Sequence, residues 1–169
     1  MEQKTVWPGK GHHIPAPTEV ACIYVKKIYD ACSQRECEEF FFDELILPTC
    51  VPLADLEVEC SIVPGSETFY DWSIEPIDGG PLGLVRVTVC ATLRIIVRDS
   101  NNPSVFTTND EEVCFFKEVV LYAPDPVNMQ VLAESIFEAL ACTSEVADVT
   151  NGLFVVTAIV GAFIIVKTG

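Results

Sequence analysis

LVRVTVCATLRIIVR, residues 84–98, alternates between apolar and other side chains along almost its whole length. Every odd-numbered position from Val85 to Val97 is apolar, whereas the even positions from Arg86 to Arg98 carry arginine, threonine or cysteine, with Ile96 as the exception. A period of two places one set of side chains on each face of a strand. The stretch therefore predicts a half-buried antiparallel strand.

Further strand-like segments lie on both sides of this stretch, separated by turn residues. Residues 55–63 alternate in the same way, and the loop DSNNPS at 99–104 leads to an apolar return segment. Many short strands bounded by Pro, Gly, Asn and Asp are typical of β-sandwiches. We expect an all-β fold, a two-sheet sandwich that is jelly-roll-like. The expected strands are 20–29, 39–47, 55–63, 68–77, 84–98, 113–122 and 153–166.

The last of these segments, LFVVTAIVGAFIIV at 153–166, is apolar on both faces. A membrane-spanning helix needs about 20 residues, and this run is shorter and rich in β-branched residues. We therefore predict a strand and no membrane span. Both faces of such a strand need to be covered, either by two layers of one subunit or by a neighbouring subunit. The residues predicted to form this assembly strand are Leu153, Val155, Ile159, Phe163 and Ile165.

The chain divides into an arm and one domain. Residues 1–19 contain three prolines and two glycines and have no apolar periodicity, so we expect an extended N-terminal arm that is flexible or links subunits. Residues 20–169 have the length of a single β-sandwich domain.

Similar segments indicate an internal duplication within that domain, in which residues 41–98 resemble residues 115–167. FFDELILPTCVP (41–52) and FFKEVVLYAPDP (115–126) share five identities in twelve. LVRVTVCATLRIIVR shares six identities in fifteen with LFVVTAIVGAFIIVK at 153–167. Cys60 and Cys142 fall between the paired segments at comparable positions.

Residues 126–142 are ambiguous on this reading. They have helical propensity, and Pro126 is well placed to begin a helix. The duplication instead favours a strand at 136–146, matching 55–63. Both interpretations stay open at this point.

Composition excludes several classes of function. The chain has 25 acidic and 10 basic residues, a formal charge of −15, which argues against nucleic acid and anionic membrane surfaces as partners. Half of the residues are apolar, so the chain is not intrinsically disordered. The only histidines, His12 and His13, lie in the arm, and no nucleophile, phosphate-loop or zinc-protease motif is present. We predict no enzymatic activity, no cofactor and no metal, although paired acids leave a glycosidase as an alternative.

Eight cysteines are spread along the chain without a CxxC pair, which favours disulfides over zinc. No secretory signal precedes them, so reduced core cysteines are the alternative. Cys90 lies on the polar face of residues 84–98, where a disulfide would staple two sheets or two subunits. The candidate disulfide or crosslink cysteines are Cys22, Cys32, Cys37 and Cys90. The other cysteines are Cys50, Cys60, Cys114 and Cys142.

CIYVKKIYDACSQREC (22–37), RVTVCATLRIIVR (86–98) and FFKEVVLYAPDP (115–126) resemble the cysteine-rich, strand-rich proteins of clostridial spore surfaces, in coat or exosporium layers. The resemblance implies self-assembly into crosslinked sheets or fibres, with itself and other spore-surface proteins as partners. It also implies synthesis in a cytoplasm without a signal peptide, followed by exposure to an oxidising exterior after lysis. The expected location is the spore surface or the extracellular space.

We therefore expect a structural, self-assembling subunit of an extracellular or spore-associated layer or fibre, stabilised by strand packing and disulfides. One alternative is a soluble β-sandwich binding module for a carbohydrate or protein, with mostly reduced cysteines. A viral-type shell subunit is a second alternative. The sequence leaves open the disulfide connectivity, the symmetry, and the choice between sheet, filament and closed shell.

Overall fold

All strand pairs are antiparallel in the computed structural model, which describes residues 21–23 and 30–169. The strands of this described part are β1 (Ala21–Ile23), β2 (Asp30–Phe42), β3 (Leu56–Ile62), β4 (Thr68–Pro76), β5 (Leu82–Asp99), β6 (Asn102–Tyr122), β7 (Val131–Asp148) and β8 (Leu153–Thr168). A single 3-10 turn, η1 (Leu53–Asp55), precedes β3. The N-terminal arm predicted at residues 1–19 lies outside the described residues.

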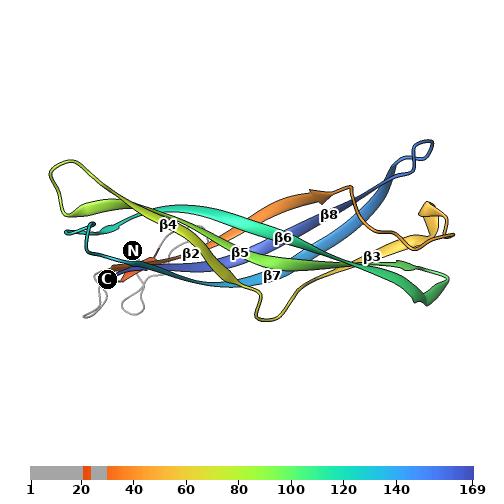
Figure 1. Ribbon diagram of the computed structural model, residues 1–169, viewed down its shortest axis with the longest axis horizontal. Helices are drawn as coiled ribbons and strands as arrows, with labels where there is room; N and C mark the ends of the chain where they lie inside the picture. The colour runs from red at the N-terminus through yellow and green to blue at the C-terminus, as the bar shows by residue number, and fades with distance from the viewer. Residues whose placement is uncertain (1–20, 24–29) are drawn as a thin grey trace.

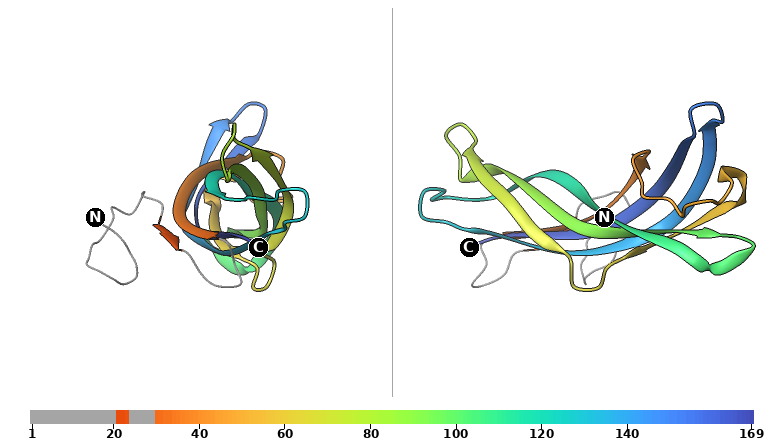
Figure 2. Two further views of the ribbon diagram at one scale, coloured as in Figure 1. Left: turned by 90° about the vertical axis from the view of Figure 1, so that its left-hand side faces the viewer. Right: turned by 45° about the vertical axis from the view of Figure 1, so that its right-hand side comes forward.

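The strands form two sheets. Sheet A has the order β1-β2-β8-β7. In sheet B, β5 is central, with β6 along one side and β3 and β4 one after the other along the other side. Figure 1 shows the elongated molecule, and the end-on view in Figure 2 shows the strands of both sheets around one interior. The predicted all-β, two-sheet sandwich is confirmed, while the jelly-roll topology stays a prediction.

β5 has the two faces that its sequence predicts. Its odd-numbered side chains from Val85 to Val97 are buried in the core between the sheets. The even positions face outward, and β6 pairs with β5 along nearly its whole length, from Leu82↔Tyr122 to Arg98↔Phe106. At about 1.5–3 kcal/mol for each buried aliphatic side chain, this strand provides much of the apolar stabilisation of sheet B.

Two interactions join sheet A to sheet B at the seams, the places where an edge strand of one sheet lies beside an edge strand of the other. At the seam between β3 and β7, Cys60 and Cys142 form a disulfide. At the seam between β2 and β6, Lys117 Nζ lies 2.7 Å from Glu36 Oε2, and the Lys117 side chain is buried. A buried lysine requires such a partner, because an unpaired charge in this position would be strongly destabilising.

The two halves of the chain exchange strands. The first half contributes β2 to sheet A, and it contributes the β3, β4 and β5 segments to sheet B. The second half contributes β6 to sheet B and the β7–β8 hairpin to sheet A. The turn between β3 and β4 lies opposite the middle of β5, and a bulge between Ala139 and Ala141 of β7 lies opposite the middle of β8. These two irregularities fall at matching points of the aligned segments. The duplication itself stays a prediction.

Cys60 and Cys142 are not equivalent within this arrangement. Cys60 lies opposite Ile95 of β5, whereas Cys142 lies opposite Ala158 of β8. In the aligned segments Ile95 matches Ile164, not Ala158. The expectation of comparable positions was therefore wrong, and the two residues meet across the seam instead.

Most of the ambiguous segment 126–142 belongs to a strand: β7 begins at Val131, after a turn at residues 126–128. β7 pairs with β8 from Val131↔Thr168 to Asp148↔Leu153, so tertiary pairing overrides the helical propensity of its Glu- and Ala-rich sequence. β6 also begins earlier than predicted. Only Ser100 and Asn101 form the turn that follows β5, since Asp99 pairs with Asn102.

Asn109 connects the segment after β2 to β6. Ile46 N donates to Asn109 Oδ1 at 2.7 Å, and Asn109 Nδ2 donates to the Ile46 carbonyl oxygen at 3.0 Å. Thr107 Oγ1 donates to the same carbonyl oxygen at 2.6 Å. Asn109 is buried, and its side-chain amide pairs with the Ile46 backbone as the backbone of a further strand would.

Replacing Asn109 with alanine is expected to lower the free energy of unfolding by about 1–3 kcal/mol, because it leaves the Ile46 amide without a partner. Urea denaturation measures the loss. Asn101→Ala, in the exposed β5–β6 turn, is the control and should change stability by no more than about 0.5 kcal/mol. Equal effects of the two substitutions would contradict this role for Asn109.

Candidate assembly surface and cysteine sites

The seam disulfide joins Cys60 of β3 to Cys142 of β7, with their Cα atoms 5.7 Å apart. The two cysteines are 82 residues apart in the sequence. Cys60 follows the inward alternation of Leu56, Val58 and Ile62. That alternation was visible in the sequence, but it does not identify the partner cysteine.

A second disulfide joins Cys90 to Cys114, which lie directly opposite each other on β5 and β6. Their Cα atoms are 4.1 Å apart. The expectation that Cys90 staples two sheets or two subunits is corrected here, because the bond links neighbouring strands of one sheet. The sheet-to-sheet link comes instead from Cys60, which the sequence placed among the other cysteines.

The remaining predicted cysteines divide into two kinds. Cys32 is buried and disulfide-bonded, and the strand register sets Cys22 opposite it. Cys37 and Cys50 are free thiols, and both are exposed. Cys37 lies in the middle of β2, whereas Cys50 lies in the loop that follows, where its φ of 62° is in the left-handed region.

The outer face of sheet A is unusually apolar. We use this name for the side chains of β2, β8 and β7 that point away from sheet B. On β8 the even-numbered side chains from Phe154 to Val166 are buried, so the odd-numbered ones form the outer face. The predicted assembly strand, Leu153, Val155, Ile159, Phe163 and Ile165, lies on this face, with Leu153 exposed and the others half-buried.

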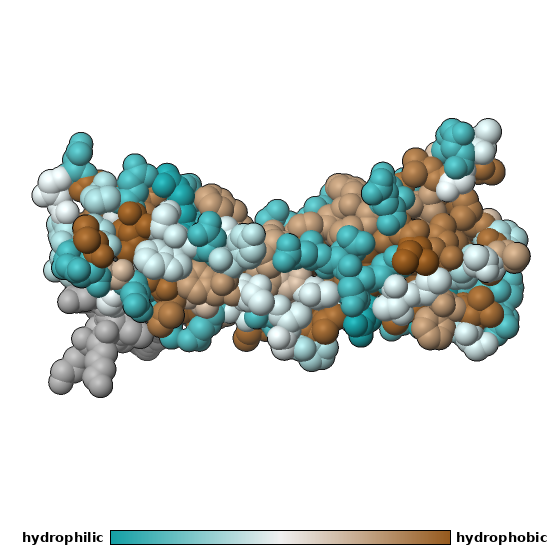
Figure 3. Space-filling view, in the orientation of Figure 1, coloured by the Kyte–Doolittle hydropathy of each residue, from teal (hydrophilic) through white to brown (hydrophobic). Residues whose placement is uncertain are grey.

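Neighbouring strands extend this apolar surface. Ile136 of β7, 68% exposed, lies opposite Phe163, and Phe41 of β2 lies opposite Thr157. Leu132 and Leu140 of β7 are also exposed. Sequence analysis missed the β7 contribution, because residues 126–142 were left between helix and strand. In the face shown in Figure 3, the broadest apolar area lies toward the end that carries the β7–β8 turn.

A hollow of about 380 Å³ lies at the middle of the outer face of sheet A. Its floor is Gly161, which has no side chain and pairs with Cys37 on one side and Glu138 on the other. Leu140 and Phe163 form part of its wall. The free thiol of Cys37 therefore lies at the edge of an apolar depression.

The outer face of sheet B combines ion pairs with exposed apolar side chains, among them Phe106, Phe116 and Val120. Three arginines of β5 pair with acids on the flanking strands, and each is partly exposed. The pairs are Arg86 with Glu75 at 2.8 Å and Glu118 at 2.6 Å, Arg94 with Asp110 at 2.9 Å, and Arg98 with Glu59 at 3.0 Å. A smaller hollow of about 200 Å³ is lined by Asp71, Trp72, Ser73, Arg86, Thr88 and Phe116.

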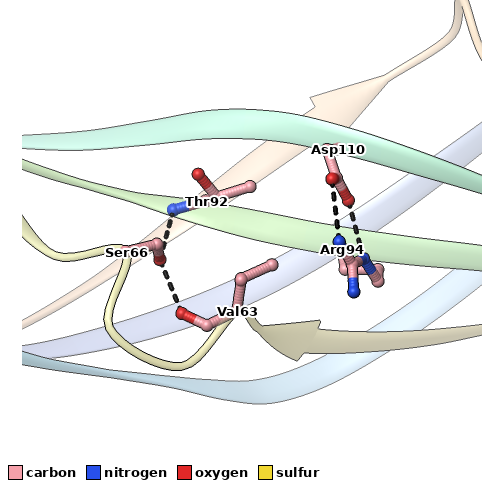
Figure 4. A network of polar contacts seen from close by, with 5 residues as sticks. All are labelled: Val63, Ser66, Thr92, Arg94 and Asp110. Carbon is pink, nitrogen blue, oxygen red and sulfur yellow. Dashed lines mark hydrogen bonds and ion pairs between the residues drawn. The ribbon is translucent and has the colours of Figure 1, made fainter.

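Figure 4 shows how β5 is held from both sides near Arg94. Thr92 N donates to Ser66 Oγ at 3.0 Å, and Ser66 Oγ donates to the Val63 carbonyl oxygen at 2.7 Å. Arg94 Nε and Nη2 donate to the two carboxylate oxygens of Asp110 at 2.9 and 3.0 Å. This bidentate contact lowers the pKa of Asp110 below its usual value and raises the pKa of Arg94.

Arg94→Gln should return the pKa of Asp110 toward the usual value for aspartate. Because the folded-state pKa is depressed, the pair stabilises the fold above the unfolded pKa, near 4, and this stabilisation is lost as the pH falls through the folded value. NMR titration of the Asp110 carboxyl carbon measures the change directly. The pKa of Asp148, lowered by hydrogen bonds from Asn151 and Thr150, is the control and should not move.

Among the described side chains, the one group arranged to share a metal ion is Cys90, Glu112 and Cys114. Both sulfurs are bonded to each other, so neither is available as a thiolate ligand. His12 and His13 lie outside the described residues. Within the described part of the chain, no helix is long and apolar enough to cross a membrane, and residues 153–166 belong to β8.

Comparison with known protein families, curated proteins and solved structures finds no match.

Proposed function

We propose that the protein is a structural, self-assembling subunit of an extracellular or spore-associated layer or fibre. The observation that carries this proposal is the apolar outer face of sheet A. Apolar side chains line β8 on both of its faces, and Ile136 and Leu140 add exposed apolar surface beside it. Contiguous apolar surface of this kind marks protein interaction sites.

The cysteines support the same function. The Cys60–Cys142 and Cys90–Cys114 disulfides fit a protein that works in an oxidising environment. Two exposed thiols, Cys37 and Cys50, remain available for bonds between subunits. Covalent links of this kind would make an assembly resistant to dissociation.

The proposed partners are other copies of this chain and other spore-surface proteins, following the resemblance of residues 22–37, 86–98 and 115–126. Release by lysis into an oxidising exterior would allow the cysteines to form disulfides. The excess of acidic residues makes a nucleic acid an unsuitable partner.

Sedimentation velocity and electron microscopy test the proposal with a matched pair of variants. Ile136→Lys places a charge on the outer face of sheet A, whereas Val127→Lys places one in the β6–β7 loop, where Val127 is 90% exposed. We expect sheets or fibres from the wild type and Val127→Lys, and loss of assembly for Ile136→Lys. A monodisperse monomer in all three samples would overturn the proposal. Closed particles would favour a viral-type shell.

The second candidate, a carbohydrate-binding module, is favoured by the hollow on sheet B. Trp72 and Phe116 are exposed there beside Asp71 and Arg86, and sugars stack on aromatic rings while their hydroxyls bond to such polar groups. Titration calorimetry against a panel of oligosaccharides, with Trp72→Ala as the control, tests this candidate. Saturable heat that Trp72→Ala abolishes would support it.

A further inference from the structure

We infer that the outer face of sheet A binds the same face of a second copy, antiparallel, about a twofold axis along the Cys37–Gly161–Glu138 rung. This inference deepens the proposed function and rests on it. The axis lies midway between sheet A of one copy and sheet A of the other, and it runs across the strands. In this arrangement β2 faces β2 of the second copy, and β8 faces β8. Such a contact is isologous, and each residue on one side of the axis meets a residue on the other side.

The charges of β2 are self-complementary about this rung. Arg35, Cys37 and Glu39 point to the same outer face, opposite Phe163, Gly161 and Ile159 of β8. Arg35 is exposed and has no ionic partner among the described residues. An antiparallel twofold places Arg35 of each copy against Glu39 of the other, forming two equivalent ion pairs.

The apolar side chains of β8 match in the same register. Phe163 lies one rung to one side of the axis and Ile159 one rung to the other, so each copy packs Phe163 against Ile159 of its neighbour. Leu140 lies over Gly161, where an added Cβ atom would be 3.0 Å from Leu140 Cδ1, so the Leu140 side chains of the two copies pack beside the axis. Glu138 of each copy faces Glu138 of the other at the β7 edge of the contact, where water and salt screen the repulsion between the two carboxylates.

The face is large enough for a specific interface. β2 and β8 pair over 13 rungs, which at about 3.4 Å each makes a strip of roughly 44 Å. Three strands at about 4.8 Å spacing give a width of roughly 14 Å, so two copies would bury about 1,200 Å² in total. Specific interfaces begin at about this size.

The register also places the two Cys37 thiols opposite each other. A low-molecular-weight disulfide such as oxidised glutathione would join them by two exchange steps. The first Cys37 thiolate displaces one small thiol to form a mixed disulfide, and the second displaces the other. One S–S bond is broken in the reagent and one is formed between the copies, while the two protons leave on the released thiols.

Oxidation of three purified proteins tests the contact: the wild type, Cys37→Ser and, as the matched control, Cys50→Ser. After treatment with oxidised glutathione, a non-reducing gel should show a dimer at about twice 18.6 kDa for the wild type and Cys50→Ser, but not for Cys37→Ser. A dimer that survives Cys37→Ser and disappears in Cys50→Ser would overturn the inference.

Charge exchange tests the antiparallel register itself. Arg35→Glu and Glu39→Arg, made singly, each place like charges together, and we expect the Cys37-linked dimer to form about tenfold less readily. The double variant restores both ion pairs and should recover the wild-type yield. Failure of the double variant to recover, with thermal unfolding unchanged, would show that the register is wrong.

The outcomes separate this inference from the proposed function. If the wild type forms sheets or fibres but neither Cys37→Ser nor the charge exchanges alter its crosslinking, the twofold contact is wrong and self-assembly stands. If the wild type stays monomeric under oxidising conditions at every concentration, both fail.

Discussion

Replacing Phe115 with alanine is expected to lower the free energy of unfolding by about 3–5 kcal/mol. Phe115 is fully buried on the inner face of β6. Its ring packs edge-to-face against Phe40 of β2 and Phe137 of β7, with ring centroids 6.0 and 5.4 Å away. The substitution removes both contacts and leaves a cavity where strands of the two sheets meet. Chemical denaturation under oxidising conditions measures the loss.

Phe116→Ala is the matched control for this prediction. Phe116 is the next residue on β6, has the same side chain and is 60% exposed on the opposite face. Its replacement should cost no more than about 0.5 kcal/mol. If the two substitutions destabilised the fold equally, the assignment of inner and outer faces on β6 would be wrong.

The second large effect is expected from the seam disulfide. Replacing Cys60 and Cys142 together with alanine opens a loop between two residues that are 82 positions apart. The chain-entropy relation gives about 4.5 kcal/mol of lost stability. Thermal unfolding of oxidised samples measures the change. The bond also holds β3 of one sheet to β7 of the other, so the seam should show the fastest increase in amide exchange.

Cys90→Ala with Cys114→Ala is the comparison for the seam variant. That disulfide spans 24 residues and joins strands that already pair along nearly their whole length, so we expect a smaller loss, about 3.4 kcal/mol. A larger loss for this pair than for Cys60 and Cys142 would show that the seam bond adds little to the fold.

The sequence predicts the sheets better than their connections. Alternation in residues 84–98 predicts the inner and outer faces of β5 correctly, because burial on one face is a local pattern. The pairing of β2 with β8 has no local signal, since it depends on which edges meet after the chain has collapsed. The strand at residues 131–148 was ambiguous for the same reason, as only its pairing with β8 decides between helix and strand.

The candidate surface could be predicted in part. The apolar outer side of residues 153–166 indicates a face that needs cover, and the structure places those residues on the outside of sheet A. The hollow at Gly161 could not be predicted, because it requires Cys37, Leu140 and Phe163 from three strands. Cys90 shows what a face pattern cannot predict. Its side chain points outward as expected, but its disulfide partner, Cys114, points outward from the neighbouring strand of the same sheet.

The pairing of β2 with β8 has a consequence for the order of events during synthesis. Asp30 pairs with Thr168, so β2 leaves the ribosome long before the strand that completes its sheet exists. Until then β2 has an unpaired edge, and pairing over such a sequence distance is slow. The outer face of sheet A therefore forms only after β8 has been synthesised.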